Sequence, residues 1–121
     1  MAKRILIVED QEDNRRILRD MLAAAGFEYI EAITGAEGVE KAAAHRPDLI
    51  LMDIQLPGID GYEASRRIRS VPELRSIPII AVTSFALSGD EHKAFDAGCS
   101  AYISKPFSPR QLLAKIREHL P

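Results

Sequence analysis

Short apolar runs alternate along the chain with longer segments whose apolar residues recur every three to four positions. Continuous short runs are typical of buried strands, whereas the longer spacing is typical of helices with one buried face. We expect strands at about 4–9, 27–33, 48–53, 77–82 and 101–104. The apolar centre of 48–53 is unbroken, which is typical of a strand covered on both faces.

Helices are expected between these strands. The intervening segments predict helices over about 12–25, 35–45, a stretch that ends near Ser70, 86–97, and the segment after Ser108. Apolar residues at helical spacing mark the first and last of these: Ile17, Leu18, Met21, Leu22 and Ala25, and Leu112, Leu113, Ile116 and Leu120. The helix over 86–97 is the weakest, because Gly89 lowers its propensity by about 1 kcal/mol relative to Ala.

Residues at the predicted helix ends agree with these limits. Gly26 and Gly98 stand where left-handed C-terminal caps belong. Ser108 suits the N-cap of the last helix, with Pro109 at its first position. Strands and helices therefore alternate from end to end in five βα units, which predicts one α/β domain over residues 1–121 with a parallel sheet.

Composition and charge narrow the classes of function. The 121 residues, 46% of them hydrophobic, suit one domain with its own core. The net charge of −2 argues against nucleic-acid binding, which needs a clustered basic excess. Cys99 is the only cysteine and cannot form an internal disulfide, and the first apolar run is too short for a signal peptide or a membrane span. We expect a cytoplasmic protein without nucleic-acid or membrane partners.

Polar residues follow four of the predicted strands. They are Glu9 and Asp10, Asp53, Thr83, and Lys105. In an open parallel sheet, ligands bind beyond the carboxyl ends of the strands, so these groups are expected to share one crevice. Clustered carboxylates favour a cation, and Mg2+ prefers oxygen ligands of this kind together with a phosphate oxygen.

The same residue types suit phosphoryl transfer. An ionised aspartate can act as the nucleophile and form an aspartyl phosphate. Thr83 offers a hydroxyl, the Ser84 backbone an N–H, and Lys105 a compact positive charge for the phosphoryl oxygens.

Each of these residues also has an ordinary structural interpretation. Glu9 and Asp10 suit a solvated strand end, Asp53 or Thr83 a helix cap, and Lys105 a surface lysine. Only their joint occurrence at strand ends favours a site. Three histidines have no partner at metal-ligand spacing and are expected at the surface, namely His45, His92 and His119. Cys99 is expected to be a buried small residue.

The motifs resemble the receiver domain of two-component response regulators over nearly the whole chain. The resemblance rests on Glu9-Asp10 after Ile-Leu-Ile-Val, on Asp53 within Leu-Met-Asp-Ile-Gln-Leu-Pro-Gly-Ile-Asp-Gly, on Thr83-Ser84, and on Lys105-Pro106. It implies a flavodoxin-like fold with strand order 2-1-3-4-5. It also implies that Asp53 accepts a phosphoryl group from a phosphohistidine on a sensor histidine kinase or a histidine phosphotransfer protein.

Further roles follow from the resemblance. It implies that Glu9, Asp10, Asp53 and the backbone carbonyl of Gln55 bind Mg2+. Thr83 and Lys105 are expected to bind the phosphoryl oxygens, and the protein to assist its own phosphorylation and dephosphorylation.

The resemblance also implies a switch and a particular backbone bond. Thr83 and Tyr102 are expected to move on phosphorylation and to remodel the surface of the fourth helix, fifth strand and fifth helix, where a downstream protein docks. Without the resemblance, Tyr102 is most simply a half-buried core aromatic. The peptide bond between Lys105 and Pro106 is expected to be cis, and the protein to be a monomer or weak dimer.

Three functions remain open on the sequence. The first is a phosphorylation-switched module that signals through protein contacts, since the last helix ends at Pro121; a close variant is a receiver from a hybrid histidine kinase. The second is a Mg2+-dependent phosphatase, although such enzymes usually carry a second Asp where Gln55 stands. The third is a flavin or nucleotide binder, which the lack of a Gly-rich loop after the first strand disfavours.

Overall fold

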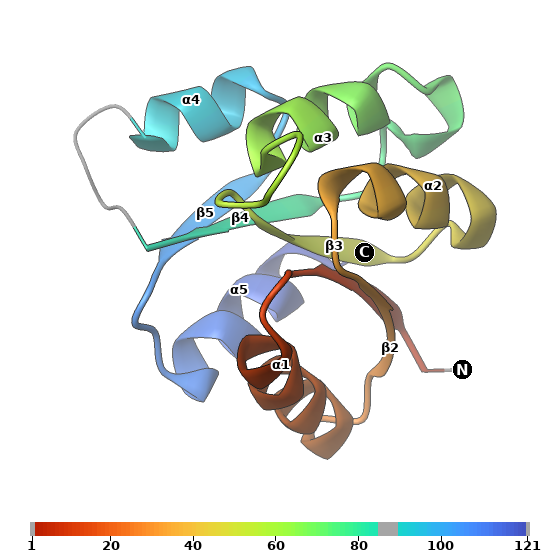
Figure 1. Cartoon of the computed structure of the whole chain (residues 1–121). Coiled ribbons are helices and arrows are strands. Elements are labelled where there is room, and N and C mark those ends of the chain that lie inside the picture. Colours follow the sequence, from red (N-terminus) through yellow and green to blue (C-terminus); the bar gives the residue numbers. More distant parts are fainter. Residues whose placement is uncertain (1, 85–89, 121) are drawn as a thin grey trace.

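The computed structural model describes residues 2–84 and 90–120 and contains a parallel sheet with helices on both faces (Figure 1). Its strands are β1 (Arg4–Val8), β2 (Glu28–Ala32), β3 (Leu49–Asp53), β4 (Ile79–Thr83) and β5 (Ala101–Ser104). The helical elements are α1 (Glu12–Ala24), α2 (Gly35–His45), α3 (Gly61–Arg69), the 3-10 helix η1 (Pro72–Leu74), α4 (Asp90–Asp96) and α5 (Pro109–His119).

The sheet has the order β2-β1-β3-β4-β5, and all neighbouring strands are parallel. This confirms the flavodoxin-like order that the family resemblance implied. Every residue of β3 and β4 is buried, which explains their unbroken apolar composition. Strand order reverses around β1 and β3, and the crevice in which such sheets bind ligands lies beyond the carboxyl ends of these strands.

Two apolar cores fill the space between the sheet and its helices. Helices α1 and α5 cover one face, and α2, α3 and α4 cover the other (Figure 1). The first core includes Leu22 and Ile116, and the second includes Ile68 and Ala94, all of them fully buried. The strand ends are thereby held in place by packing on both sides.

The predicted helix ends agree well with the structure. Gly26 and Gly98 adopt φ angles of 87° and 97° after their helices, as expected of left-handed caps. Ser108 forms a capping box with Gln111, and Pro109 is the first residue of α5. Asp60, which the sequence did not single out, caps α3 through a 2.9 Å bond from the Glu63 N–H, so Asp53 does not serve that purpose.

Several predicted limits were wrong. Strand β4 begins at Ile79 rather than at 77, because Ile77 donates its N–H to Leu74 of η1 at 3.2 Å and Pro78 has no N–H to donate. The short helix η1 was not predicted. The expected start of the fourth helix, at 86 and including Gly89, falls outside the described residues.

Ile17 was expected on the buried face of the first helix, but 58% of it is exposed. Leu18, Met21 and Leu22 form the buried stripe of α1 instead. Ile17 lies beside this stripe and lines a cavity between α1 and α5.

The remaining expectations about surface and core residues agree with the structure, except that His119 is only partly exposed. His45 and His92 are exposed, His119 is half-buried, and Cys99 is buried and unpaired. None of the helices in the described part of the chain is both long enough and apolar enough to span a bilayer.

Candidate acidic site

Three carboxylates meet at the carboxyl edge of the sheet. Glu9 and Asp10 follow β1, and Asp53 is the last residue of β3. Each offers an oxygen, and these oxygens all lie within 4.8 Å of one another. Glu9 and Asp53 are only 2% and 5% exposed, whereas Asp10 is half-buried. The strand-end pattern in the sequence therefore identified groups that the fold does bring together.

The backbone around Asp53 is fixed by the loop that follows it. The Gln55 N–H donates to Asp53 Oδ1 at 3.1 Å, and the Gly61 N–H donates to the carbonyl of Ile54 at 2.9 Å. A β-carbon on Gly61 would lie 2.3 Å from the carbonyl oxygen of Asp53, closer than atoms can approach. Gly61 thus lets the start of α3 pack against the end of β3.

Lys105 brings a positive charge to the carboxylates. It follows β5, and its bond to Pro106 is cis, as the resemblance implied. Its Nζ lies 3.1 Å from Glu9 Oε1 and 3.7 Å from Asp53 Oδ2. The Lys105 N–H also donates to the carbonyl of Thr83 at 2.7 Å, which ties this loop to the end of β4.

Thr83 and Tyr102 lie on the neighbouring strands. Thr83 is buried at the end of β4, one residue beyond Val82, which pairs with Asp53. Tyr102 in β5 is half-buried and packs against the core on the face covered by α3 and α4. Thr83 therefore lies at the same edge of the sheet as the carboxylates, and Tyr102 lies within the strand that leads to Lys105.

The two buried carboxyl groups strongly influence each other. Burial of Asp53, its hydrogen bond to Glu9 and the negative charge of Glu9 raise the pKa of Asp53 to about 7, against the opposing charge of Lys105. Burial also disfavours ionised Glu9, but hydrogen bonds from Asp53 and the Gln11 N–H, together with Lys105, hold the pKa of Glu9 below its usual value. The pair thus ionises at Glu9 first and at Asp53 only at higher pH.

The donor set fits a hard divalent cation. It consists of carboxylate oxygens, the ligands that Mg2+ prefers, and two of the three groups are buried where uncompensated charge is costly. Lys105 contributes one positive charge against three carboxylates. A cation at this edge would relieve the repulsion that raises the pKa of Asp53.

One contact at the site had no signal in the sequence. The Arg15 side chain reaches back from α1 and donates from Nη1 to the carbonyl of Glu9 at 3.0 Å. Arginines are common on exposed helix faces, so only the tertiary structure reveals this bond.

Comparison with known proteins agrees with this geometry. The family model for the response regulator receiver domain matches residues 5–117. The chain belongs to this family. It is 48% identical over 120 residues to the polar-differentiation response regulator DivK of Brucella anthropi, covering 99% of this chain and 98% of the relative, and 47% identical to that of Brucella ovis over the same shares.

Solved receiver structures are similarly close. The receiver domain of a sensor histidine kinase from Pseudomonas aeruginosa, described with a magnesium ion in its active-site cleft, superimposes with a TM-score of 0.91 at 37% identity, covering 98% of this chain and 97% of that one. The chemotaxis protein CheY4 of Vibrio cholerae gives a TM-score of 0.94 at 27% identity, covering 99% and 100%.

Membership of the family establishes the broad function. The chain is a receiver domain that acts as a phosphoacceptor in two-component phosphorelay signalling. Receiver domains typically bind Mg2+, and they have histidine kinase or phosphotransfer partners and downstream targets.

Proposed function

We propose that Asp53 is the phosphoacceptor of this receiver domain and that residues 1–121 work as one signalling unit. The observation that carries the proposal is the position of Asp53. It is a buried carboxylate at the end of a central strand, within reach of two further carboxylates and 3.7 Å from the ammonium of Lys105. A nucleophile, a place for a cation and a fixed positive charge are thus held together, which is what phosphoryl transfer requires.

The reaction is a displacement at phosphorus. A carboxylate oxygen of ionised Asp53 forms a bond to the phosphorus of a phosphohistidine, and the bond between phosphorus and the imidazole nitrogen breaks with its electrons going to that nitrogen. Lys105 binds a phosphoryl oxygen as a positive charge, and the hydroxyl of Thr83 donates to another. Phosphorylation needs Asp53 in its ionised form. Burial and Glu9 favour the protonated form of Asp53, so this proton must leave before the reaction.

The proposal assigns the metal site to Glu9, Asp10, Asp53 and the backbone carbonyl of Gln55. When bound there, Mg2+ supplies positive charge for the oxygens of the transferring phosphoryl group. Glu9 contributes a carboxylate that is already ionised, since its pKa is lowered. The Gln55 N–H holds Asp53 Oδ1 in place, so the backbone that carries the proposed carbonyl ligand is tied to the Asp53 side chain.

Signal output depends on Thr83 and Tyr102 in this proposal. Thr83 moves towards the phosphoryl group, and Tyr102 changes rotamer in the space beside it. The surface formed by α4, β5 and α5 then changes for a downstream protein. The bond between the Lys105 N–H and the Thr83 carbonyl supports this coupling, because it links the two loops that contact the phosphoryl group.

The same site is proposed to assist loss of the phosphoryl group to water. The proposal also includes a cytoplasmic location, a phosphohistidine donor on a sensor kinase or a phosphotransfer protein, and a monomer or weak dimer. Gln55 supports a signalling role over a phosphatase that acts on external substrates, since it cannot act as a general acid two residues after the nucleophile.

Acetyl phosphate tests the proposal without a partner protein. Intact mass is measured after incubation with acetyl phosphate and Mg2+ for the unmodified chain and for Asp53→Asn. With Mg2+, the unmodified chain is expected to gain one phosphoryl group and the variant none. With EDTA in place of Mg2+, the unmodified chain is expected to gain almost none. Equal labelling of the two proteins would overturn the assignment of Asp53.

A further inference from the structure

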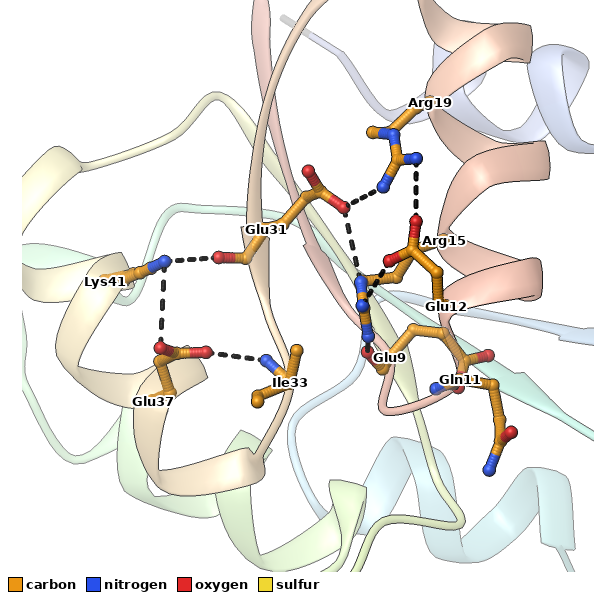
Figure 2. A network of polar contacts seen from close by, with 9 residues as sticks. All are labelled: Glu9, Gln11, Glu12, Arg15, Arg19, Glu31, Ile33, Glu37 and Lys41. Carbon is orange, nitrogen blue, oxygen red and sulfur yellow. Dashed lines mark hydrogen bonds and ion pairs between the residues drawn. The ribbon is translucent and has the colours of Figure 1, made fainter.

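Arg15 joins α1 to the turn that carries two of the three carboxylates. Its Nη1 donates to the carbonyl of Glu9 at 3.0 Å, and its Nε lies 3.3 Å from Glu31 Oε1 of β2. Its Nη2 forms an ion pair with Glu12. Figure 2 shows the guanidinium between these three groups, and only 13% of the side chain is exposed. One side chain thus connects β1, β2 and α1 at the edge of the acidic site.

The turn from Glu9 to Gln11 is held at its two ends by backbone bonds, from the Glu9 N–H to the Ala32 carbonyl and from the Arg15 N–H to the Gln11 carbonyl, both at 3.0 Å. The Glu9 carbonyl is held by the side chain of Arg15. Gln11 is the N-cap residue of α1, but its side chain makes no capping bond. The Gln11 N–H instead donates to Glu9 Oε2 at 3.2 Å. That carboxylate also belongs to the acidic cluster, so a cation would compete for its oxygens. The bond from Arg15 goes to the backbone of Glu9 and is independent of what the carboxylate binds.

We propose that Arg15 is a positioning residue that fixes the backbone of Glu9 so that Glu9 and Asp10 face Asp53. Groups that orient metal ligands in this way commonly influence affinity without touching the metal. The inference rests on the proposed Mg2+ site and adds a residue that the family motifs do not include.

The surroundings of Arg15 favour a geometric rather than an electrostatic role. Glu12 and Glu31 each form ion pairs with both Arg15 and Arg19, so two positive charges face two negative ones (Figure 2). The four groups sum to zero charge. They also hold the planar guanidinium of Arg15 in the orientation that reaches the Glu9 carbonyl.

The two possible roles predict effects of opposite sign. A nearby positive charge repels Mg2+, so its removal would strengthen Mg2+ binding if charge were decisive. Removal of a positioning bond weakens Mg2+ binding, because the two ligands that follow β1 are then less well ordered.

Arg19 provides a matched control. It has the same two ion-pair partners, at 3.0 Å from Glu12 and 2.7 Å from Glu31, and its side chain is 22% exposed. Arg19 donates to these two carboxylates, whereas Arg15 also donates to the Glu9 carbonyl. Arg15→Met and Arg19→Met therefore remove the same charge from the same network and differ in the bond to Glu9.

Titration calorimetry with Mg2+ tests the inference on the full chain. We expect Arg15→Met to weaken Mg2+ binding by about tenfold and Arg19→Met to leave it within about twofold of the unmodified chain. In the metal-free proteins, hydrogen exchange at the Gln11 amide should be faster in Arg15→Met than in Arg19→Met. Unchanged or tighter binding in Arg15→Met, or equal weakening in both variants, would overturn the inference.

Lysine variants and the Mg2+ affinity of the unmodified chain distinguish a failure of the inference from a failure of folding or of the metal site. If Arg15→Met does not fold, Arg15→Lys and Arg19→Lys replace the pair. Lysine keeps the charge but lacks the planar fork with which Arg15 reaches the Glu9 carbonyl and both carboxylates. Weakening in Arg15→Lys alone therefore supports the inference, and equal affinities overturn it. A lack of Mg2+ binding by the unmodified chain would instead overturn the proposed metal site, and the inference with it.

Discussion

At the scale of single residues, the site consists of two buried carboxyl groups that share one ammonium group. Lys105 contacts both Glu9 and Asp53. One positive charge only partly offsets two buried negative charges, and burial together with the bond to and the charge of Glu9 raises the pKa of Asp53 to about 7. A proton and a cation are therefore alternative ways of relieving the same repulsion, and they should compete.

This competition makes the stability of the metal-free protein depend on pH. The pKa of Asp53 rises from 3.8 to about 7 on folding, so between these values the folded state binds more protons than the unfolded state. The free energy of unfolding should then fall as pH rises towards the folded pKa, by on the order of 2–3 kcal/mol between pH 5 and pH 8 for this group. Urea unfolding in EDTA at pH 5 and pH 8 measures the change.

Asp53→Asn is the control for this prediction, because its carboxamide does not titrate. The variant should be more stable than the unmodified chain at pH 8, and the difference should shrink at pH 5. The lowered pKa of Glu9 acts below its usual value of 4.5 and with the opposite sign, so it does not contribute in this window. A stability difference independent of pH would contradict the pKa assigned to Asp53.

At the scale of elements, the polar residues that follow the strands were predictable and the contacts that orient them were not. Parallel strands end at one edge, so Glu9, Asp53 and Lys105 could be placed together from the sequence. The bond from Arg15 to Glu9 and the close approach of Gly61 to Asp53 join residues whose nearness depends on helix packing. Local patterns contain no signal for such contacts.

Gly61→Ala tests whether the start of α3 positions Asp53. The added β-carbon would lie 2.3 Å from the Asp53 carbonyl oxygen and 2.7 Å from the Ile54 α-carbon, and both are backbone atoms. We expect a loss of stability of about 3 kcal/mol and slower phosphorylation by acetyl phosphate. Urea unfolding and intact mass measure the two effects.

Gly58→Ala is the matched control in the same loop. Gly58 has a φ angle of 76°, but a β-carbon there would meet no atom within 4 Å. Gly58→Ala should lose about 1–2 kcal/mol of stability, because alanine is disfavoured in the left-handed conformation. Its phosphorylation should continue at nearly the normal rate. Equal losses of labelling in the two variants would show that loop strain, not contact with Asp53, is responsible.

At the scale of the whole molecule, the alternation of apolar patterns was enough to predict the fold class. It was not enough to predict strand order, because residues 4–9 or 48–53 do not by themselves indicate their neighbours. The order came from the family resemblance. The limits that were wrong, at η1 and the start of β4, belong to short segments in which one proline and one 3-10 turn decide the backbone.

Mg2+ is expected to stabilise the whole fold. A ligand that binds only the folded state raises the free energy of unfolding by about 1.4 kcal/mol when its concentration is ten times Kd. Thermal unfolding with MgCl2, compared with NaCl at equal ionic strength, should give a higher Tm for the unmodified chain and a much smaller shift for Asp53→Asn. A Tm that responds equally to both salts would argue against a metal site.

Chemical mapping of the modified residue tests most directly whether Asp53 carries the phosphoryl group. Borohydride reduces an aspartyl phosphate to homoserine, which changes the mass of the peptide that contains the residue. After treatment with acetyl phosphate and Mg2+, we predict homoserine at position 53, and only there. Homoserine at another aspartate, or an unreduced phosphate on a hydroxyl or imidazole side chain, would contradict the account.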